Sequence, residues 1–265
     1  MNVKVTVLGC GNSAGVPSIG NVWGQCDPNE PRNRRTRPSI AIESGSTTVI
    51  VDTGPDFKAQ INNTSIGRVH GVIYTHAHSD HTNGIDELRV LRLRHKELIP
   101  VYSNLDTIND LRARFSYMFS EIDPEGLYPQ VLVPHVLDPQ HYGQPLTIGD
   151  INIVPFEQSH GSAGVTLGLR IGNLAYSTDM FDLDQQALET LSGIDTWIVD
   201  AAGYKMPHNF VHATLKQVLA LNDIVQAKNV YLTHMPSFMD YQTLLGELPS
   251  GFKPAYDGLV LEAQT

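Results

Sequence analysis

The stretch Thr75-His76-Ala77-His78-Ser79-Asp80-His81 is the most informative part of the chain. The run Val72-Ile73-Tyr74 before it is apolar and β-branched or aromatic, which is typical of a buried strand. A regular element cannot turn three histidines and a carboxylate at this spacing to one side, whereas a loop can turn them inward around cations. Neutral imidazole suits zinc and other late divalent metals, and carboxylate also accepts manganese. The spacing argues against a solvated turn, and we expect a metal site at this strand end.

The stretch resembles the His-x-His-x-Asp-His signature of the metallo-β-lactamase superfamily. Four residues match the signature at every position: His76, His78, Asp80 and His81. The resemblance implies an α/β fold, the αββα metallo-β-lactamase sandwich, with the metal site at one sheet edge. It also implies three further ligands downstream, in the order histidine, bridging aspartate, histidine. The candidates, each at the end of a predicted strand, are His160, Asp179 and His234.

By the same resemblance, these ligands divide between two divalent metal ions, Mn2+ or Zn2+. One ion would be held by His76, His78 and His160. The other would be held by Asp80, His81 and His234, and Asp179 would bridge the two ions. Asp52, in Val51-Asp52-Thr53-Gly54, matches the aspartate of the superfamily that orients a metal ligand from behind. A turn-forming aspartate before Gly54 is the alternative interpretation of Asp52.

Outward from the histidine cluster, the chain alternates short predicted strands and helices, and we expect one hydrolase domain over residues 1–265. Period-two alternation and short apolar runs predict strands at 3–7, 39–43, 47–51, 72–74, 151–156, 166–171, 174–177, 196–200, 230–232 and 259–262. Helical spacing of apolar residues predicts helices at 56–61, 85–91, 105–119, 183–191 and 215–221. The segment 117–141 has no regular pattern and is expected to be an insertion over one face.

Composition narrows the class of protein further. The formal net charge of -10 disfavours binding to bulk nucleic acid, because an acidic surface repels phosphate backbones. No stretch approaches the roughly 20 apolar residues that span a bilayer, and the first residues do not form a signal peptide, so we expect a cytoplasmic protein that does not bind membranes. Two cysteines, Cys10 and Cys26, form no disulfide framework and are expected to be reduced.

The superfamily acts on lactams, thioesters and phosphodiesters, so the fold alone does not choose the substrate. By resemblance, an aspartate rather than a cysteine at position 179 argues against a true β-lactamase. His212-Ala213-Thr214 resembles the His-Ser-Thr motif of the phosphodiesterase branch, where the histidine contacts phosphate or protonates the leaving oxygen. A polar helix cap is the alternative for His212, and His208 is a second candidate of the same kind.

Within that branch the chain is most similar to the PhnP-like group. The segments that carry this resemblance are Gly9-Cys10-Gly11, Gly15-Val16-Pro17, the arginines before Pro38-Ser39, Leu232-Thr233-His234-Met235 and Ala255-Tyr256-Asp257-Gly258-Leu259. The chain departs from the group in its first long loop. That loop has the single cysteine Cys26 where the group has closely spaced cysteines on a structural zinc, so we expect no such zinc here.

We therefore expect a binuclear metal-dependent phosphodiesterase for a small phosphodiester, such as a cyclic nucleotide or a cyclic sugar phosphate. A metal-bridging hydroxide would attack phosphorus, with Asp80 and His212 as the catalytic residues. The substrate contacts expected are His212, His208, Arg34 and Arg35. Ribonuclease Z-like RNA processing, thioester hydrolysis and a catalytically silent nucleotide-binding protein remain alternatives. A homodimer is also expected, although no interface pattern stands out.

Overall fold

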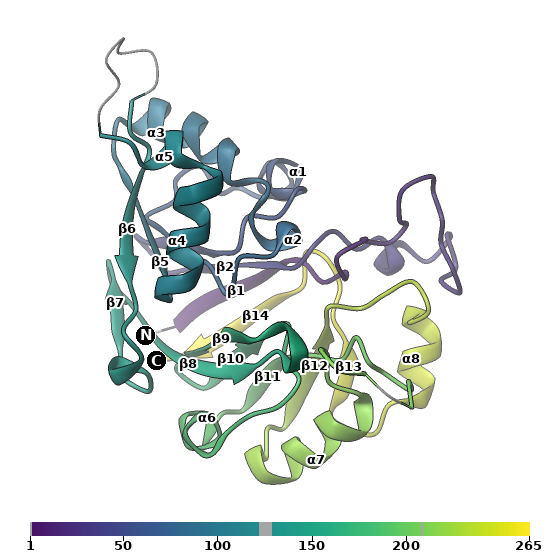
Figure 1. Cartoon of the computed structure of the whole chain (residues 1–265). Coiled ribbons are helices and arrows are strands. Elements are labelled where there is room, and N and C mark those ends of the chain that lie inside the picture. Colours follow the sequence, from purple (N-terminus) through teal and green to yellow (C-terminus); the bar gives the residue numbers. More distant parts are fainter. Residues whose placement is uncertain (1, 122–128, 208) are drawn as a thin grey trace.

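The computed structural model describes residues 2–121, 129–207 and 209–265 and shows two seven-stranded sheets packed face to face (Figure 1). The first sheet has the order β14 (Val260–Gln264), β1 (Asn2–Gly9), β2 (Ser39–Glu43), β3 (Thr48–Val51), β4 (Gly71–Ile73), β5 (Ile99–Ser103) and β6 (Leu132–Val136). The second has the order β13 (Phe252–Pro254), β12 (Asn229–Thr233), β11 (Thr196–Asp200), β10 (Leu174–Ser177), β9 (Val165–Ile171), β8 (Ile151–Ser159) and β7 (Leu146–Ile148).

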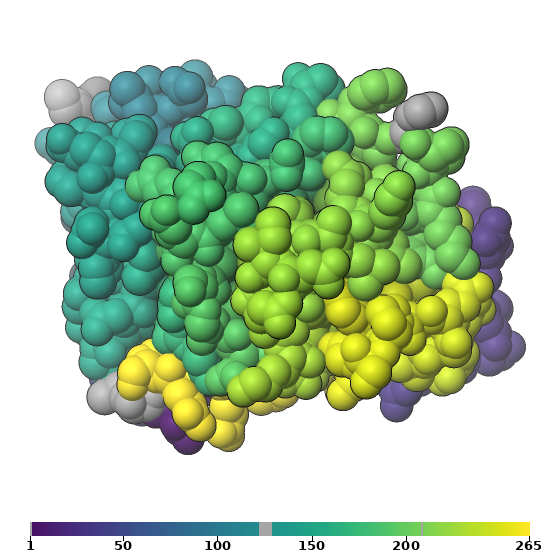
Figure 2. Space-filling view, turned by 90° about the horizontal axis from the view of Figure 1, so that it is seen from below, coloured from purple at the N-terminus to yellow at the C-terminus, as the bar shows by residue number. Residues whose placement is uncertain are grey.

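Helices cover the outer face of each sheet. Those on the first sheet are α1 (Phe57–Asn62), α2 (Ser79–Thr82), α3 (Leu88–His95), α4 (Leu105–Arg114) and α5 (Ser116–Phe119). Those on the second are α6 (Gln185–Leu191), α7 (Leu215–Val225) and α8 (Tyr241–Glu247). Short 3-10 turns are η1 (Pro31–Asn33), η2 (Ile85–Glu87), η3 (Pro139–His141) and η4 (Gly161–Ala163). Figure 2 shows the second half of the chain covering one face, with the N-terminal loop emerging at its edge. The predicted αββα sandwich is confirmed.

The strands place alternate side chains in two separate cores. In β2, Ile40 and Ile42 face the second sheet, whereas Ala41 belongs to the core under α1, α3 and α4. In β3, Val49 likewise faces the second sheet, and Ile50 belongs to the core under the helices. Successive side chains of a strand point to opposite faces of the sheet. Because consecutive positions in these strands are apolar, both faces of the first sheet are apolar.

Parallel strands bring the chemically important residues to one edge of the sandwich. Strands β3, β4 and β5 run parallel in the first sheet, and β10, β11 and β12 run parallel in the second. The carboxyl ends of parallel strands meet at the same sheet edge, which is where ligands bind in such folds. The two sheets are also joined there, because Leu167 N donates a hydrogen bond to Thr75 O at 3.0 Å.

Several predicted elements are corrected by the structure. The described part of the segment 117–141 is not an insertion, because it contains β6, which pairs in parallel with β5; residues 122–128 lie outside the described residues. Pro134 and His135 hide this strand in the sequence, and proline is tolerated because β6 lies at the sheet edge. The helix predicted at 105–119 is broken at Phe115, where φ is -124°. Strands β5, β7 and β13 and helix α8 were not predicted. Among the described residues, no helix is long and apolar enough to cross a membrane.

Candidate metal centre

The centre is built on turns that immediately follow strands. The loop from Thr75 to His78 follows β4, and His78 is the N-cap of α2. Asp52, Asp179 and His234 follow β3, β10 and β12, with φ angles of 62°, 50° and 57°. A non-glycine residue in this left-handed region costs of order 1–3 kcal/mol, and such strain gathers at functional sites. Three strained residues at one edge therefore indicate a site whose geometry is fixed by the fold.

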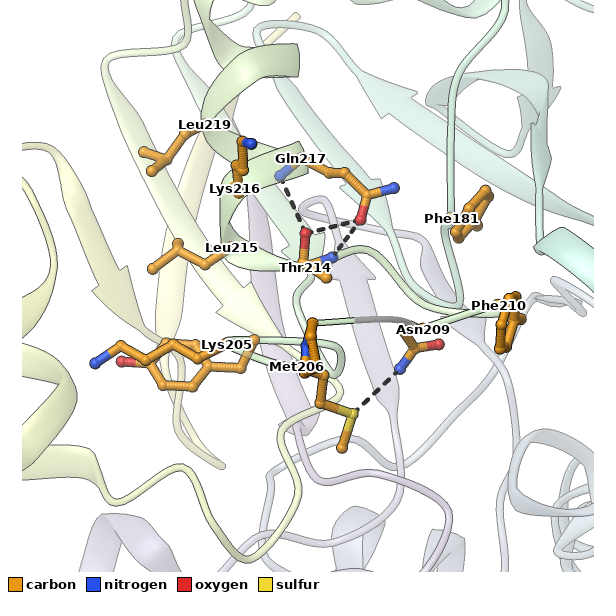
Figure 3. A pocket seen from close by; sticks show the side chains of 12 residues that line it. Phe181, Lys205, Met206, Asn209, Phe210, Thr214, Leu215, Lys216, Gln217 and Leu219 are labelled. Atoms are coloured by element: carbon orange, nitrogen blue, oxygen red, sulfur yellow. Dashed lines mark hydrogen bonds between the residues drawn. The ribbon is translucent and has the colours of Figure 1, made fainter.

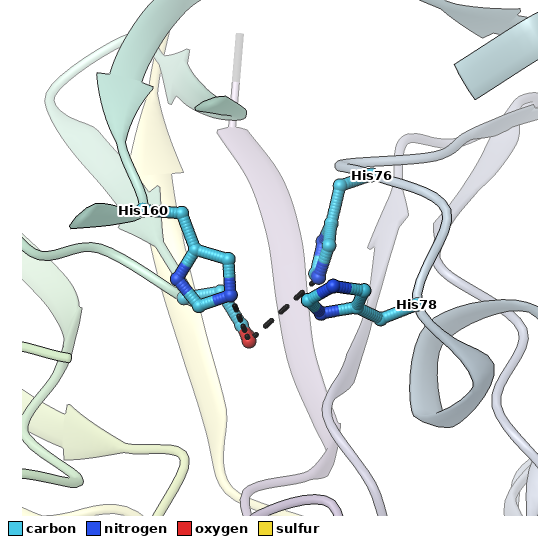
Figure 4. A group of neighbouring side chains, drawn as sticks. His76, His78 and His160 are labelled. Atoms are coloured by element: carbon cyan, nitrogen blue, oxygen red, sulfur yellow. Dashed lines mark ion pairs between the residues drawn. The ribbon is translucent and has the colours of Figure 1, made fainter. Parts of the chain in front are cut away.

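The first group of side chains surrounds one oxygen of Asp179. Figure 4 shows His76, His78 and His160 turned toward one another. Nε2 of His76 lies 3.8 Å from Asp179 Oδ1, and Nε2 of His160 lies 3.6 Å from the same atom. The rings of His76 and His78 are 4.4 Å apart, and those of His78 and His160 are 5.3 Å apart.

The second group surrounds the other oxygen of Asp179. Its Oδ2 lies 3.1 Å from His81 Nε2 and 3.3 Å from His234 Nε2. Asp80 Oδ2 lies 3.4 Å from His81 Nε2 and 3.6 Å from His234 Nε2. Asp179 thus presents one oxygen to each group, as a bridging ligand would. The two groups, His76-His78-His160-Asp179 and Asp80-His81-Asp179-His234, have the membership that was predicted.

The donor atoms of both groups fit divalent cations. The potential ligand atoms within each group all lie within 4.8 Å of one another. Nε2 of His76, His81 and His234 is buried and has no hydrogen-bond partner among the described residues. Leaving a buried polar atom unsatisfied costs about 1–3 kcal/mol, and a cation would remove that cost. Burial also holds the pKa of His76 well below its usual value, which keeps the imidazole in the neutral form that binds metal.

Hydrogen bonds from outside the two groups orient several of these ligands. Asp52 Oδ2 lies 2.7 Å from His81 Nδ1, and Asp52 Oδ1 accepts a hydrogen bond from Thr75 N at 2.8 Å. His160 Nδ1 lies 2.8 Å from Val211 O. With Nδ1 as the donor in both rings, Nε2 is left free to face a metal. Asp52 is therefore placed as a positioning residue, and the turn-forming alternative does not describe its side chain.

His212 lies beside the two groups and is held by a partner that was not predicted. Its ring is 5.1 Å from that of His160 and 4.7 Å from that of His234. Its Nδ1 lies 2.7 Å from Asp200 Oδ2, and Asp200 is fully buried at the end of β11. Burial disfavours the charged imidazolium, but the carboxylate of Asp200 outweighs it and raises the pKa of His212 to about 9 in the metal-free protein. The arrangement can hold a proton next to the centre.

Asp200 could have been found in the sequence, because it ends a predicted strand as the metal ligands do. Its carboxylate also accepts hydrogen bonds from Met180 N at 3.0 Å and Ala202 N at 2.7 Å. These bonds fix Asp200 independently of His212. His208 lies outside the described residues.

The arginine cluster supports the loop more than it faces the centre. Arg35 is only 2 % exposed, and its guanidinium donates to Asn33 Oδ1 at 3.1 Å and Pro236 O at 3.5 Å. That side chain is thus buried in the loop, which disfavours the predicted contact between Arg35 and substrate; the contact stays a prediction. Arg34 is exposed and lies over the ring of Trp23, and its substrate contact stays a prediction.

Arg37 lies near the segment that carries Asp80. A Cβ placed on Gly54 would lie 2.1 Å from Asp80 O and 3.2 Å from Arg37 Cβ, so the backbone of Gly54 packs against both residues with no room for a side chain. Arg37 Nε pairs with Asp56 Oδ2 at 3.0 Å. The position requires glycine, because any side chain would push the Asp80 loop away from Arg37.

Polar contacts fasten the first long loop where the PhnP-like group has cysteine ligands. Cys26 is a free, buried thiol. Asn33 Nδ2 donates to Asp240 Oδ2 at 2.7 Å, and Gln25 N donates to Ser237 O at 2.8 Å. These bonds tie the loop to the start of α8. The remaining histidines lie elsewhere; His70 Nδ1, for example, accepts a hydrogen bond from Thr48 N at 2.9 Å.

Comparisons with known proteins agree with this geometry. A family model described as a beta-lactamase superfamily domain matches residues 47–235, a span that contains both ligand groups and His212. The crystal structure of a new diphosphatase from the PhnP family is 31% identical, with a TM-score of 0.86, and the match covers 99% of this chain and 97% of that one.

Two curated relatives are longer proteins. An octanoyltransferase of Porphyromonas gingivalis (strain ATCC BAA-308 / W83) is 29% identical over 97% of this chain and 51% of its own length. A ribonuclease Z of Bradyrhizobium sp. (strain ORS 278) is 30% identical over 49% of this chain and 42% of its own. The chain thus spans about half the length of the curated relatives it matches. From the family model and the full-length structural match, the chain belongs to the metallo-β-lactamase superfamily and, within it, to the PhnP family.

Proposed function

We propose that the chain is a metal-dependent hydrolase of small phosphodiesters, such as a cyclic nucleotide or a cyclic sugar phosphate. The observation that carries the proposal is the position of the His212–Asp200 pair beside two ligand groups that share Asp179. Two divalent cations, Mn2+ or Zn2+, would supply an activated water and neutralise charge on the phosphate when bound. His76, His78 and His160 would hold one ion; Asp80, His81 and His234 would hold the other.

The chain's own residues would manage the leaving group. Hydrolysis forms a bond from the water oxygen to phosphorus and breaks the bond from phosphorus to the leaving oxygen. That oxygen needs a proton, and His212 can donate one from Nε2 because Nδ1 is engaged by Asp200. Asp200 keeps the imidazole charged until transfer and fixes the orientation of its ring. Asp80 would act as a catalytic residue through the metal that it holds.

A phosphoric anhydride is a second candidate substrate class. The full-length relative at 31% identity is described as a diphosphatase, and an anhydride with one ester on each phosphorus presents the same kind of reacting centre. RNA processing is less well supported, because the ribonuclease Z match covers half of this chain and the net charge is -10. Acyl transfer is suggested only by the octanoyltransferase, and the chain spans about half the length of that relative.

The test is hydrolysis by metal-stripped protein reconstituted with manganese or zinc. Two substrates would be compared: bis-p-nitrophenyl phosphate, whose leaving group departs readily, and a 2′,3′-cyclic nucleotide, whose alcohol leaving group needs a proton. His212→Ala should reduce turnover of the cyclic nucleotide by about 10²- to 10⁴-fold and that of the nitrophenyl ester by less. His141→Ala, on the exposed η3 turn, is the matched control and should behave as wild type.

Metal content of each variant separates chemistry from folding. The proposal requires His212→Ala to retain the metal of the wild-type protein. Absence of metal-dependent turnover on both phosphodiesters and on a dinucleoside diphosphate would refute the function. Turnover of a thioester in that case would move the chain to the acyl-hydrolysing members of its superfamily.

A further inference from the structure

A pocket of about 650 Å³ lies between Phe181, Phe210 and the start of α7 (Figure 3). Its walls include Phe181, two residues after Asp179, and Thr214, two residues after His212. The volume is within the range of small-molecule sites, about 300–1,000 Å³. The pocket is thus large enough for a nucleoside-sized group, and two of its wall residues belong to the segments that carry Asp179 and His212.

The walls of the pocket are apolar and aromatic, with a few polar groups between them. Phe181 and Phe210 lie at one end in Figure 3, and Lys205 and Met206 lie at the other. Phe210 is 73% exposed. A large apolar side chain held open to solvent beside a catalytic centre is typical of a binding surface for a ligand with an aromatic face.

Backbone hydrogen bonds hold the two aromatic residues against the same segment. Phe181 N donates to Ser159 O at 2.7 Å, and Phe210 O accepts from Ser162 N at 2.9 Å. A Cβ on Gly161 would lie 1.9 Å from Phe210 O, so the close approach of the two segments requires glycine there. Both rings are therefore carried by backbone that is anchored next to the ligand His160.

One turn connects the pocket wall to the proton donor. Asn209 Oδ1 accepts hydrogen bonds from Val211 N at 3.0 Å and His212 N at 2.9 Å. Val211 O in turn lies 2.8 Å from Nδ1 of the ligand His160. A group bound against Asn209 and Phe210 would therefore contact the same turn that carries His212.

We propose that this pocket binds the nucleobase of a nucleotide substrate whose phosphate lies at the metal centre, an inference that rests on the proposed function. Bases stack on aromatic side chains whatever their sequence, because every base has a π-face. The amide oxygens of Asn209 and Gln217 accept hydrogen bonds within the chain, but their amide nitrogens lie in the same wall and can donate to the edge of a base. Lys216 adds an exposed positive charge on α7 that suits an anionic substrate.

The test measures binding, not turnover. Adenosine 5′-monophosphate and ribose 5-phosphate share the phosphate and the sugar and differ in the base. By isothermal titration calorimetry on the metal-loaded protein, the former should bind about 5- to 150-fold more tightly, as expected for stacking of one base. Phe210→Ala should remove most of this preference, and Phe210→Tyr should keep it because the ring is retained.

Ile224→Ala is the control, because Ile224 is a similarly exposed apolar residue on the far part of α7. It should leave both affinities unchanged. Equal affinity of the wild-type protein for the two probes would overturn the proposal, as would an undiminished preference in both Phe210→Ala and Phe181→Ala. Because the readout is a difference between two ligands, a base preference without phosphodiester hydrolysis would sustain the pocket and refute the function. Hydrolysis without a base preference would support the proposed function and refute the proposal for the pocket.

Discussion

Asn33 and His234 are both almost fully buried polar residues, yet they differ in whether the chain supplies hydrogen-bond partners for their side chains. Asn33 Nδ2 donates to Asp27 O at 3.0 Å and Asp240 Oδ2 at 2.7 Å, and its Oδ1 accepts from Arg35 Nη2 at 3.1 Å and Tyr241 N at 2.9 Å. Both ring nitrogens of His234 have no hydrogen-bond partner among the described residues.

The difference separates structure from function. A buried amide with every donor and acceptor used holds two segments together and needs nothing further. A buried imidazole without a bond carries a free-energy cost of about 1–3 kcal/mol that only a missing partner explains. Around His234 a cation fits that role, because Asp80 and Asp179 lie within 3.6 Å of its Nε2. Around Asn33 the partners are all in the chain.

The largest expected effect comes from Asp179→Ala. Each oxygen of Asp179 faces one ligand group, so its removal should weaken both metals at once. The loss of affinity should exceed the roughly 10- to 100-fold typical of groups that only orient a ligand. Metal content after dialysis, by plasma mass spectrometry, is the measurement. Retention of two tightly bound ions would show that Asp179 does not bridge them.

Asp200→Asn should have the next largest effect, and it acts through His212. The amide keeps the size of the side chain but removes the charge that favours the imidazolium. We expect turnover of a cyclic nucleotide to fall about 10- to 100-fold, less than the roughly 10²- to 10⁴-fold of full acid catalysis, because the imidazole itself remains. Bis-p-nitrophenyl phosphate should be affected less, and metal content should be unchanged. Equal losses on both substrates would mean that Asp200 supports the centre without positioning a proton donor.

The comparison also explains which residues the sequence could predict. The ligands of the loop after β4 are local in the chain, and their spacing alone indicates metal. Asp179 and His234 are distant in sequence, but each ends an apolar strand, so their positions could be matched to the family order. Asp200 has the same placement and was missed because a single aspartate at a strand end is also typical of a turn.

Other features depend on contacts that no local pattern records. Arg35 stands in a basic run that indicates an exposed loop, whereas its burial depends on Asn33 and on Pro236 from a distant part of the chain. Strand β6 contains Pro134, which argues against a strand unless its place at the sheet edge is known. Tertiary position, not composition, decides both cases.

Asn33→Ala tests the structural side of the comparison. It removes four contacts and leaves the partners of Asn33 without bonds, so unfolding should become easier by about 3 kcal/mol. Urea unfolding followed by circular dichroism measures the change, with Asn62→Ala on exposed α1 as the control. Metal content of the folded protein should be unchanged. Loss of metal at full stability would show that this loop belongs to the centre.

Asp257 gives the smallest effect and a dependence on pH. It is partly buried and accepts hydrogen bonds from Thr36 N at 2.7 Å and Cys10 N at 3.0 Å; desolvation nevertheless raises its pKa to about 6. Because the folded state then binds a proton more tightly than the unfolded chain, stability should fall as pH rises from about 4 to about 6. The loss should be at most about 3 kcal/mol.

Asp257→Asn removes the titrating proton, so the difference in stability between wild type and variant should itself change across this pH window. Urea unfolding of both proteins at pH 4.5 and pH 7, at fixed ionic strength, measures it. A difference that stays constant with pH would mean that Asp257 is ionised throughout, held by the four hydrogen bonds to Cys10 and Thr36. In that case Asp257 would resemble Asn33 as a polar group whose hydrogen bonds are supplied by the chain.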